Sequence, residues 1–152
     1  MADASAKALP TAAAWLGYGG LLPFLFLAPV SLLDPHHAPW WRDALFAYGA
    51  IILSFIGALH WGFAMTLSEL ADGKRTARYV WSVFPALLAW PAVMLPPILS
   101  GPLLITGFLV HYWQDRRLDV IASLPAWYLP LRFRLTAVAV PCLAAGSVVR
   151  YG

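Results

Sequence analysis

Two histidines and an aspartate stand inside or at the end of apolar stretches of the chain, where ionisable side chains are rare. His60 lies in the apolar stretch at residues 44–67. His111 and Asp115 lie four residues apart at the end of the apolar stretch that begins at residue 98, and this spacing places them on one face of a helix. An ionisable group in a membrane segment is costly and usually points into the bundle or a cavity. These three residues are therefore the first candidates for a functional site.

Three chemistries suit this trio. Hydrogen bonds within a protein core would satisfy the histidines, a polar pocket could use them for a ligand or a proton, and two facing imidazoles could ligate haem or a metal ion. His36 and His37, after Asp34, are interpreted as a solvated loop rather than a metal clasp. Cys142 is the only cysteine, so no zinc-type Cys spacing exists.

Aromatic and small polar residues around the histidines extend the candidate site. One helical face carries Ala50, Ser54, Gly57, Trp61 and Ala64, with His60 on its flank, and its small residues predict close helix packing. Trp61 and Trp90 are the tryptophans best placed to line a cavity, with core packing as the alternative. No catalytic residue and no metal site is predicted, and the cofactor is left open. The predicted ligand-binding set is Ser54, His60, Trp61, Trp90, His111, Asp115, Trp127 and Arg132.

The composition places these residues in a membrane protein. Of 152 residues, 61% are hydrophobic and 11% are charged, with mean hydropathy +0.72, whereas a soluble domain carries roughly 25% charge. The alternating pattern of a membrane β-barrel is absent, so the expected class is all-α. The basic residues form short clusters beside apolar stretches, which favours contact with anionic lipid headgroups over nucleic acid.

The hydropathy pattern predicts one transmembrane domain over residues 1–152, a five-helix bundle with a retained first span. The segment from Asp115 to Arg134 is too polar to span and predicts an amphipathic helix lying in the interface before the last span. The five predicted spans cover residues 11–33, 44–67, 79–95, 98–113 and 135–149.

Basic residues predict the orientation of this bundle. With five spans, Lys or Arg side chains number eight on the side of the N-terminus and two, Arg42 and Arg150, on the other. The positive-inside rule then predicts a cytoplasmic N-terminus. The eight are Lys7, Lys74, Arg75, Arg78, Arg116, Arg117, Arg132 and Arg134.

Several stretches together carry a recognisable pattern, of which the Ser-Phe-x-Gly-x-x-His-Trp-Gly element at residues 54–62 is the most specific. The others are residues 16–24, 48–53, 82–85, 89–90, 115, 124–128 and 132. In this order they resemble a bacterial family of small inner-membrane proteins of unknown function, to which an animal mitochondrial transmembrane protein is similar. The resemblance implies a bacterial inner-membrane location and a bundle of several helices, but no activity.

The helix count and tryptophan content also look like those of the tryptophan-rich sensory and translocator family. That family's proline and tryptophan signature is missing here, so this likeness concerns layout alone.

The functional hypothesis that these features favour is a non-enzymatic membrane module. Its pocket, in the cytoplasmic half of the bundle, would bind a small apolar or amphipathic ligand or a membrane-protein partner. The alternatives are a proton-coupled transporter that uses the intramembrane histidines, and a haem-bearing redox or assembly protein. Oligomeric state is left open.

Overall fold

The computed structural model describes residues 8–149, and within them every regular element is an α-helix. Lys7 and Arg150, both used for the predicted orientation, lie outside the described residues. The helices are α1 (Thr11–Gly19), α2 (Leu22–Leu33), α3 (Ala38–Thr66), α4 (Asp72–Ala92), α5 (Pro97–Ile121) and α6 (Tyr128–Ser147).

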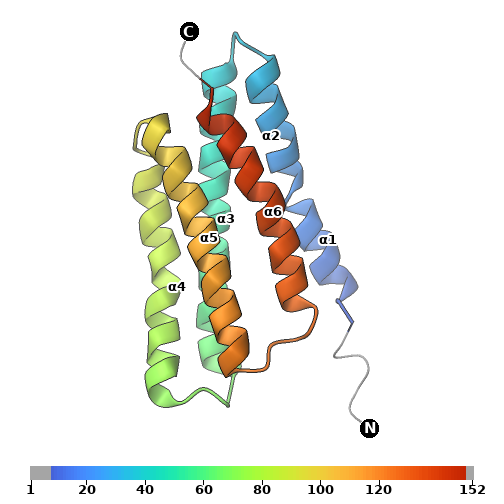
Figure 1. Cartoon of the computed structure of the whole chain (residues 1–152), viewed down its shortest axis with the longest axis vertical. Coiled ribbons are helices and arrows are strands. Elements are labelled where there is room, and N and C mark those ends of the chain that lie inside the picture. The colour runs from blue at the N-terminus through green and yellow to red at the C-terminus, as the bar shows by residue number, and fades with distance from the viewer. Residues whose placement is uncertain (1–7, 150–152) are drawn as a thin grey trace.

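Five helical rods lie side by side, because α1 and α2 follow one another as a single interrupted rod (Figure 1). Helix α3 is central and packs against α2, α4, α5 and α6. Helices α4 and α5 form a hairpin on one flank, and α1, α2 and α6 cover the other. The connections at residues 67–71 and 122–127 lie at the same end as the start of α1, the lower end in Figure 1.

The interruption between α1 and α2 has a local cause. Pro23 lacks a backbone N–H, so the carbonyl of Gly19 has no helical donor at that position. The Tyr48 hydroxyl of α3 donates to the next carbonyl, that of Gly20, at 2.8 Å. The rings of Tyr48 and Phe24 meet edge to face at 5.1 Å. Tyr48 therefore fixes the interruption against the central helix.

The predicted class, an all-α membrane protein, is confirmed. By length and composition, three segments suit a membrane span: Thr11–Leu33, which contains α1 and α2, then Ala38–Thr66 and Tyr128–Ser147. Helices α4 and α5 are also long, with 21 and 25 residues, but each carries a charged stretch at the lower end. Those charges lower their average hydropathy without shortening the rods.

The predicted interfacial helix over residues 115–134 is wrong. Residues 115–121 continue α5, residues 122–127 are a short connection, and α6 already begins at Tyr128. Leu118 of α5, Leu124 of the connection and Leu131 of α6 are all buried, so the apolar residues of this segment face the core rather than a membrane surface. The fourth span is consequently not short: 25 residues at about 1.5 Å each give a helix of about 37 Å.

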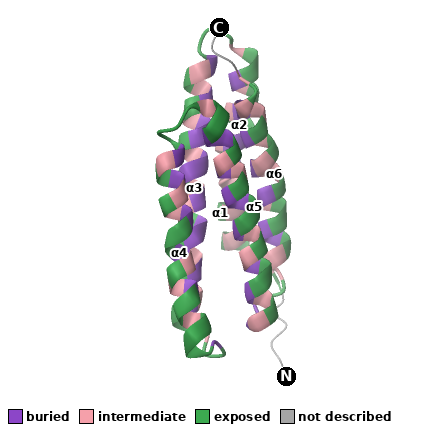
Figure 2. Ribbon diagram, turned by 60° about the vertical axis from the view of Figure 1, so that its left-hand side comes forward, coloured by how far each residue is buried: buried purple, intermediate pink, exposed green. Residues whose placement is uncertain are grey.

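The buried face of α3 is displaced from the predicted one. Gly49, Leu53, Gly57, His60 and Ala64 face the core, whereas the predicted face included Ser54, which is partly buried, and Trp61, which is half exposed. The buried strip along the inner side of α3 is visible in Figure 2. His60, placed on the flank by the sequence, thus lies in the core.

Close packing of α3 on α4 depends on Gly57. A Cβ atom at this position would lie 2.8 Å from Pro85 Cγ and 3.0 Å from the Ser82 carbonyl oxygen. Neither a proline ring nor a backbone carbonyl can rotate away, so the helices would have to separate. Gly62, in the same helix, has no heavy atom within 4 Å of such a Cβ.

We therefore expect Gly57→Ala to lower the free energy of unfolding by about 1–3 kcal/mol. The control Gly62→Ala should raise it by about 0.5–1 kcal/mol, since alanine favours the helix. Chemical denaturation in mild detergent measures both. Equal effects of the two variants would contradict the close approach at Gly57.

Candidate functional site

The candidate site is a buried cluster centred on the Asp115 carboxylate. Oδ1 accepts hydrogen bonds from His60 Nε2 at 2.9 Å and from the Tyr128 hydroxyl at 3.2 Å, and Oδ2 accepts from Arg132 Nε at 2.9 Å. His60, His111 and Asp115 are fully buried, and Arg132 is nearly so. Three helices thus supply the donors and the acceptor of one network, which lies near the lower end of the bundle.

The hydrogen-bond partners assign the ring protons of both histidines. A carboxylate oxygen only accepts, so His60 donates through Nε2. Trp81 Nε1 only donates, and it lies 3.3 Å from His111 Nδ1, so the proton of a neutral His111 is on Nε2. That atom faces Asp115 Oδ1 at 3.7 Å, beyond hydrogen-bond distance.

The two histidines converge, as their predicted placement in one half of the membrane allowed. Their ring centroids are 4.9 Å apart with an interplanar angle of 74°. His111 also lies parallel to Trp81, with centroids 6.2 Å apart. The sequence analysis missed Trp81 and Tyr128 as members of the cluster. For Tyr128 a signal existed, because Tyr128, Arg132 and Thr136 recur every four residues along one face of α6.

Apolar residues cover the cluster at both ends. Toward the lower end, a small hydrophobic cluster contains Leu70, Leu118, Ala122 and Leu124. Toward the middle of the bundle lies the main core, with Leu53, Ile56, Leu104 and Phe108. The histidines are therefore closed off from water on both sides, an arrangement that does not favour the predicted proton-relay alternative.

The cluster suits an internal ion-pair network better than a bound metal or haem. Donor atoms of His60, His111 and Asp115 lie within 4.8 Å of one another, a spacing that a metal ion can bridge. However, both Asp115 oxygens already accept hydrogen bonds, and the permanently charged Arg132 opposes a second cation. Imidazole rings in edge-to-face contact also leave no space for a porphyrin between them.

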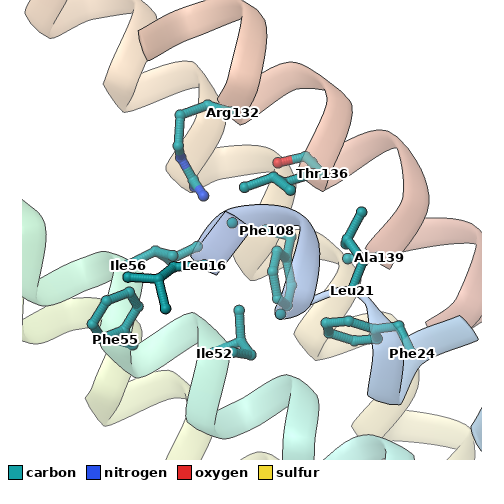
Figure 3. Close-up of a pocket in the computed structure, with 13 residues that line it drawn as sticks. Leu16, Leu21, Phe24, Ile52, Phe55, Ile56, Phe108, Arg132, Thr136 and Ala139 are labelled. Carbon is teal, nitrogen blue, oxygen red and sulfur yellow. The ribbon is translucent and has the colours of Figure 1, made fainter. Parts of the chain in front are cut away.

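Arg132, which contacts Asp115 in the cluster, also lines a neighbouring pocket. It has a volume of about 90 Å³ between α1, α2, α3 and α6. Its walls are almost wholly apolar, with Arg132 and Thr136 as the polar residues (Figure 3). Arg132 Nη2 and Thr136 Oγ1 are buried without a hydrogen-bond partner. The other lining residues are Leu16, Gly17, Gly20, Leu21, Phe24, Ile52, Phe55, Ile56, Phe108, Leu135 and Ala139.

The remaining predicted site residues neither hydrogen-bond within the cluster nor line this pocket. Trp61 is half exposed and packs on Tyr79, with ring centroids 4.9 Å apart. Ser54 and Trp90 border a shallow surface groove between α3 and α4. Trp127 packs against the small hydrophobic cluster at the lower end. Of the predicted set, the structure brings together His60, His111, Asp115 and Arg132.

The histidine loop at the opposite end forms a hydrogen-bonded turn. Asp34, which ends α2, accepts from Trp41 Nε1 at 3.0 Å and pairs with His37 Nδ1 at 2.9 Å. These bonds, with that of Trp41 foremost, lower the pKa of Asp34 below its usual 3.8. His36 is exposed. The loop thus ties α2 to α3, and among the described residues it has no group with metal-ligand spacing.

Fold and site together define the class of the protein: an integral membrane protein built as a helical bundle, with an ion-pair network and a largely apolar pocket in one half of its interior. The chain belongs to the family described as "Protein of unknown function (DUF3429)", whose pattern matches residues 9–148. The resemblance drawn from the sequence is therefore confirmed. No solved structure matches the chain with significance.

Animal proteins are among its relatives. Transmembrane protein 69 of Xenopus tropicalis is 34% identical over 149 residues, which cover 94% of this chain and 56% of the relative. Transmembrane protein 69 of Mus musculus is 27% identical over 132 residues, covering 86% of this chain and 53% of the relative. The chain thus spans about half the length of these relatives.

Removing either partner of the central ion pair should leave a buried charge uncompensated. We expect Asp115→Asn and Arg132→Met each to cost about 3–5 kcal/mol of unfolding free energy, and the double variant to cost less than their sum. Denaturation in mild detergent measures the unfolding free energies of the unmodified protein, the two single variants and the double variant. Asp119→Asn in the same helix, as a control, should change stability by less than about 0.5 kcal/mol. Strict additivity would show that the two side chains do not interact.

The loop carboxylate should make stability depend on pH. Because the folded-state pKa of Asp34 is lowered, its contribution is present above pH 3.8 and is lost as the pH falls through the lower folded-state value. Asp34→Asn should therefore lower the thermal midpoint at pH 7, and the gap to the unmodified protein should close in acid. A gap that stays constant across the acid range would contradict this assignment.

Proposed function

We propose that this protein is a non-enzymatic membrane module that binds a small, neutral, amphipathic molecule in the pocket between α1, α2, α3 and α6. The observation that carries the proposal is the pair of unpartnered polar atoms, Arg132 Nη2 and Thr136 Oγ1, at the edge of an apolar space. Buried donors without partners are costly, so such atoms are expected to meet a ligand or ordered water.

The charge balance of the cluster supports a ligand whose polar group is neutral. Asp115 already neutralises Arg132 through a contact of 2.9 Å. A second carboxylate at Nη2 would be repelled by Asp115 in a medium of low dielectric constant. A neutral oxygen acceptor, such as the carbonyl of a quinone or an ester, meets no such repulsion. We therefore infer a lipophilic molecule with a carbonyl head and an apolar body.

The mouth of the pocket supports a ligand that arrives from the lipid phase. Leu16 and Phe55, both pocket residues, are 78% and 63% exposed. In a membrane these side chains face acyl chains. Gly17 of α1 and Gly20 at the interruption both lie in the pocket wall, where larger side chains would occupy the space. A membrane-soluble molecule can thus reach Arg132 without crossing the closed ends of the bundle.

We further propose a location and an orientation. Near the start of α4, the end of α5 and the start of α6 the chain carries Lys74, Arg75, Arg116, Arg117 and Arg134. These three helix ends form the lower end of the bundle in Figure 1. The positive-inside rule then assigns this end to the cytoplasm. Within this proposal the protein crosses the bacterial inner membrane five times, and the pocket belongs to the cytoplasmic half.

The test uses the purified full chain in mild detergent and a decyl-substituted benzoquinone as the probe. Thermal unfolding should shift upward with probe concentration, as expected for a ligand of the folded state. Thr136→Val removes only an unpartnered hydroxyl, so the fold should persist. Loss of one hydrogen bond should weaken probe binding by about three- to tenfold. Decanoic acid, which has a similar tail and an anionic head, should bind more weakly.

A matched control is Thr106→Val, which makes the same chemical change at an exposed position of α5. It should leave probe binding unchanged. Absence of a shift with the quinone and with a neutral decyl ester would refute the ligand proposal. Equal weakening by Thr106→Val and Thr136→Val would mean that the effect does not depend on the hydroxyl in the pocket, and would also count against the proposal.

A further inference from the structure

A second hollow lies between α4 and α5 and shares no residue with the pocket above. It has a volume of about 520 Å³. Arginines supply its polar wall, and no acidic residue lines it. The lining residues are Arg78, Trp113, Arg116, Arg117, Val120 and Ile121. Three guanidinium groups around one space form a site for an anion, because mutual repulsion favours any group that neutralises them.

Arg78 distinguishes this hollow from a charged patch on the surface, because its side chain is buried. It is 92% buried, being 8% exposed, and its Nε has no hydrogen-bond partner. One terminal nitrogen donates to Gln114 Oε1 at 3.2 Å, which helps to orient the guanidinium group. Among the described residues, none of the three arginines forms an ion pair with a carboxylate. Their charges are therefore available to a ligand.

Arg117 is held at the rim by an aromatic ring. Its Cζ lies 3.9 Å from the centroid of Trp113, a distance typical of a cation–π contact. Trp113 is itself half exposed, as expected for a tryptophan at the membrane interface. This contact keeps the guanidinium group of Arg117 beside the apolar surface of α5 instead of extending into water.

The surroundings indicate which anion the hollow fits. Val120 and Ile121 border it, and the exposed side chains Leu109, Val110 and Trp113 continue along α5 toward the middle of the bundle. A free phosphate ion would use the arginines alone. An anionic phospholipid would place its phosphate on the arginines and its acyl chains along this apolar strip, as basic pockets between membrane helices commonly bind lipid headgroups.

We infer that the hollow between α4 and α5 binds the phosphate of an anionic phospholipid through Arg78, Arg116 and Arg117. The site is distinct from the pocket at Arg132, so either proposal can fail without the other. A phospholipid bound there would fix the depth of the α4–α5 hairpin in the membrane. The charged ends of both helices lower the average hydropathy of this hairpin.

The experiment titrates the full chain in mild detergent with phosphatidylglycerol, phosphatidylcholine or inorganic phosphate, and counts bound lipid by native mass spectrometry beside thermal shifts. Phosphatidylglycerol should bind at least about tenfold more tightly than phosphatidylcholine. Each interfacial arginine contributes about fivefold in affinity, so the double variant Arg116→Gln/Arg117→Gln should bind about thirtyfold more weakly. Both side chains are exposed, so the fold should persist.

The matched control is Lys74→Gln/Arg134→Gln, which removes two exposed charges outside the hollow. It should retain the preference for phosphatidylglycerol. Equal losses in the two double variants would overturn the proposal in favour of general surface charge. Stabilisation by inorganic phosphate that matches that of the lipid, with the same dependence on Arg116 and Arg117, would overturn the assignment to a lipid and indicate a soluble phosphate ligand.

Discussion

The ion pair between Asp115 and Arg132 is the interaction on which the interior of this bundle depends. Two charges in a medium of low dielectric constant are tolerated only when they meet each other and additional hydrogen-bond donors. His60 and Tyr128 supply those donors at 2.9 and 3.2 Å. Because the four residues come from α3, α5 and α6, the network fixes the relative rotation of three helices at once. Any rotation that exposed one member to lipid would leave the others uncompensated.

That constraint also explains how one half of the bundle can be polar inside and apolar outside. The hydrophobic cluster around Leu118 and Leu124 closes the lower end, and the main core closes the upper side. Arg132 connects the network to the membrane-facing pocket, since its Nε is committed to Asp115 while Nη2 has no partner. A ligand at Nη2 would thus contact the same residue that orders the helices, which links occupancy of the pocket to the stability of the network.

Much of the fold followed from hydropathy, but the ends of the helices did not. The apolar parts of the five rods were predicted within a few residues, because lipid requires long apolar helices. The polar stretch after Asp115 was interpreted as a helix at the membrane surface, because an average of hydropathy along the sequence treats every charged residue as exposed. In the structure Asp115 and Arg132 neutralise each other, and α5 and α6 extend into this stretch from either side of the connection at residues 122–127. No local pattern encodes a partner 17 residues away.

By itself the sequence determined the membrane environment, the all-helical class and the five rods, and it singled out His60, His111 and Asp115 as ionisable residues within or beside apolar stretches, because these features depend on composition and on spacing within single helices. The tertiary structure decided which residues meet: that Tyr128 and Trp81 join the histidines, that Trp61 and Trp90 face outward, and that Arg132 borders a pocket. The physical reason is rotational. A helix presents several faces of similar polarity, and only packing against its neighbours selects the one that is buried.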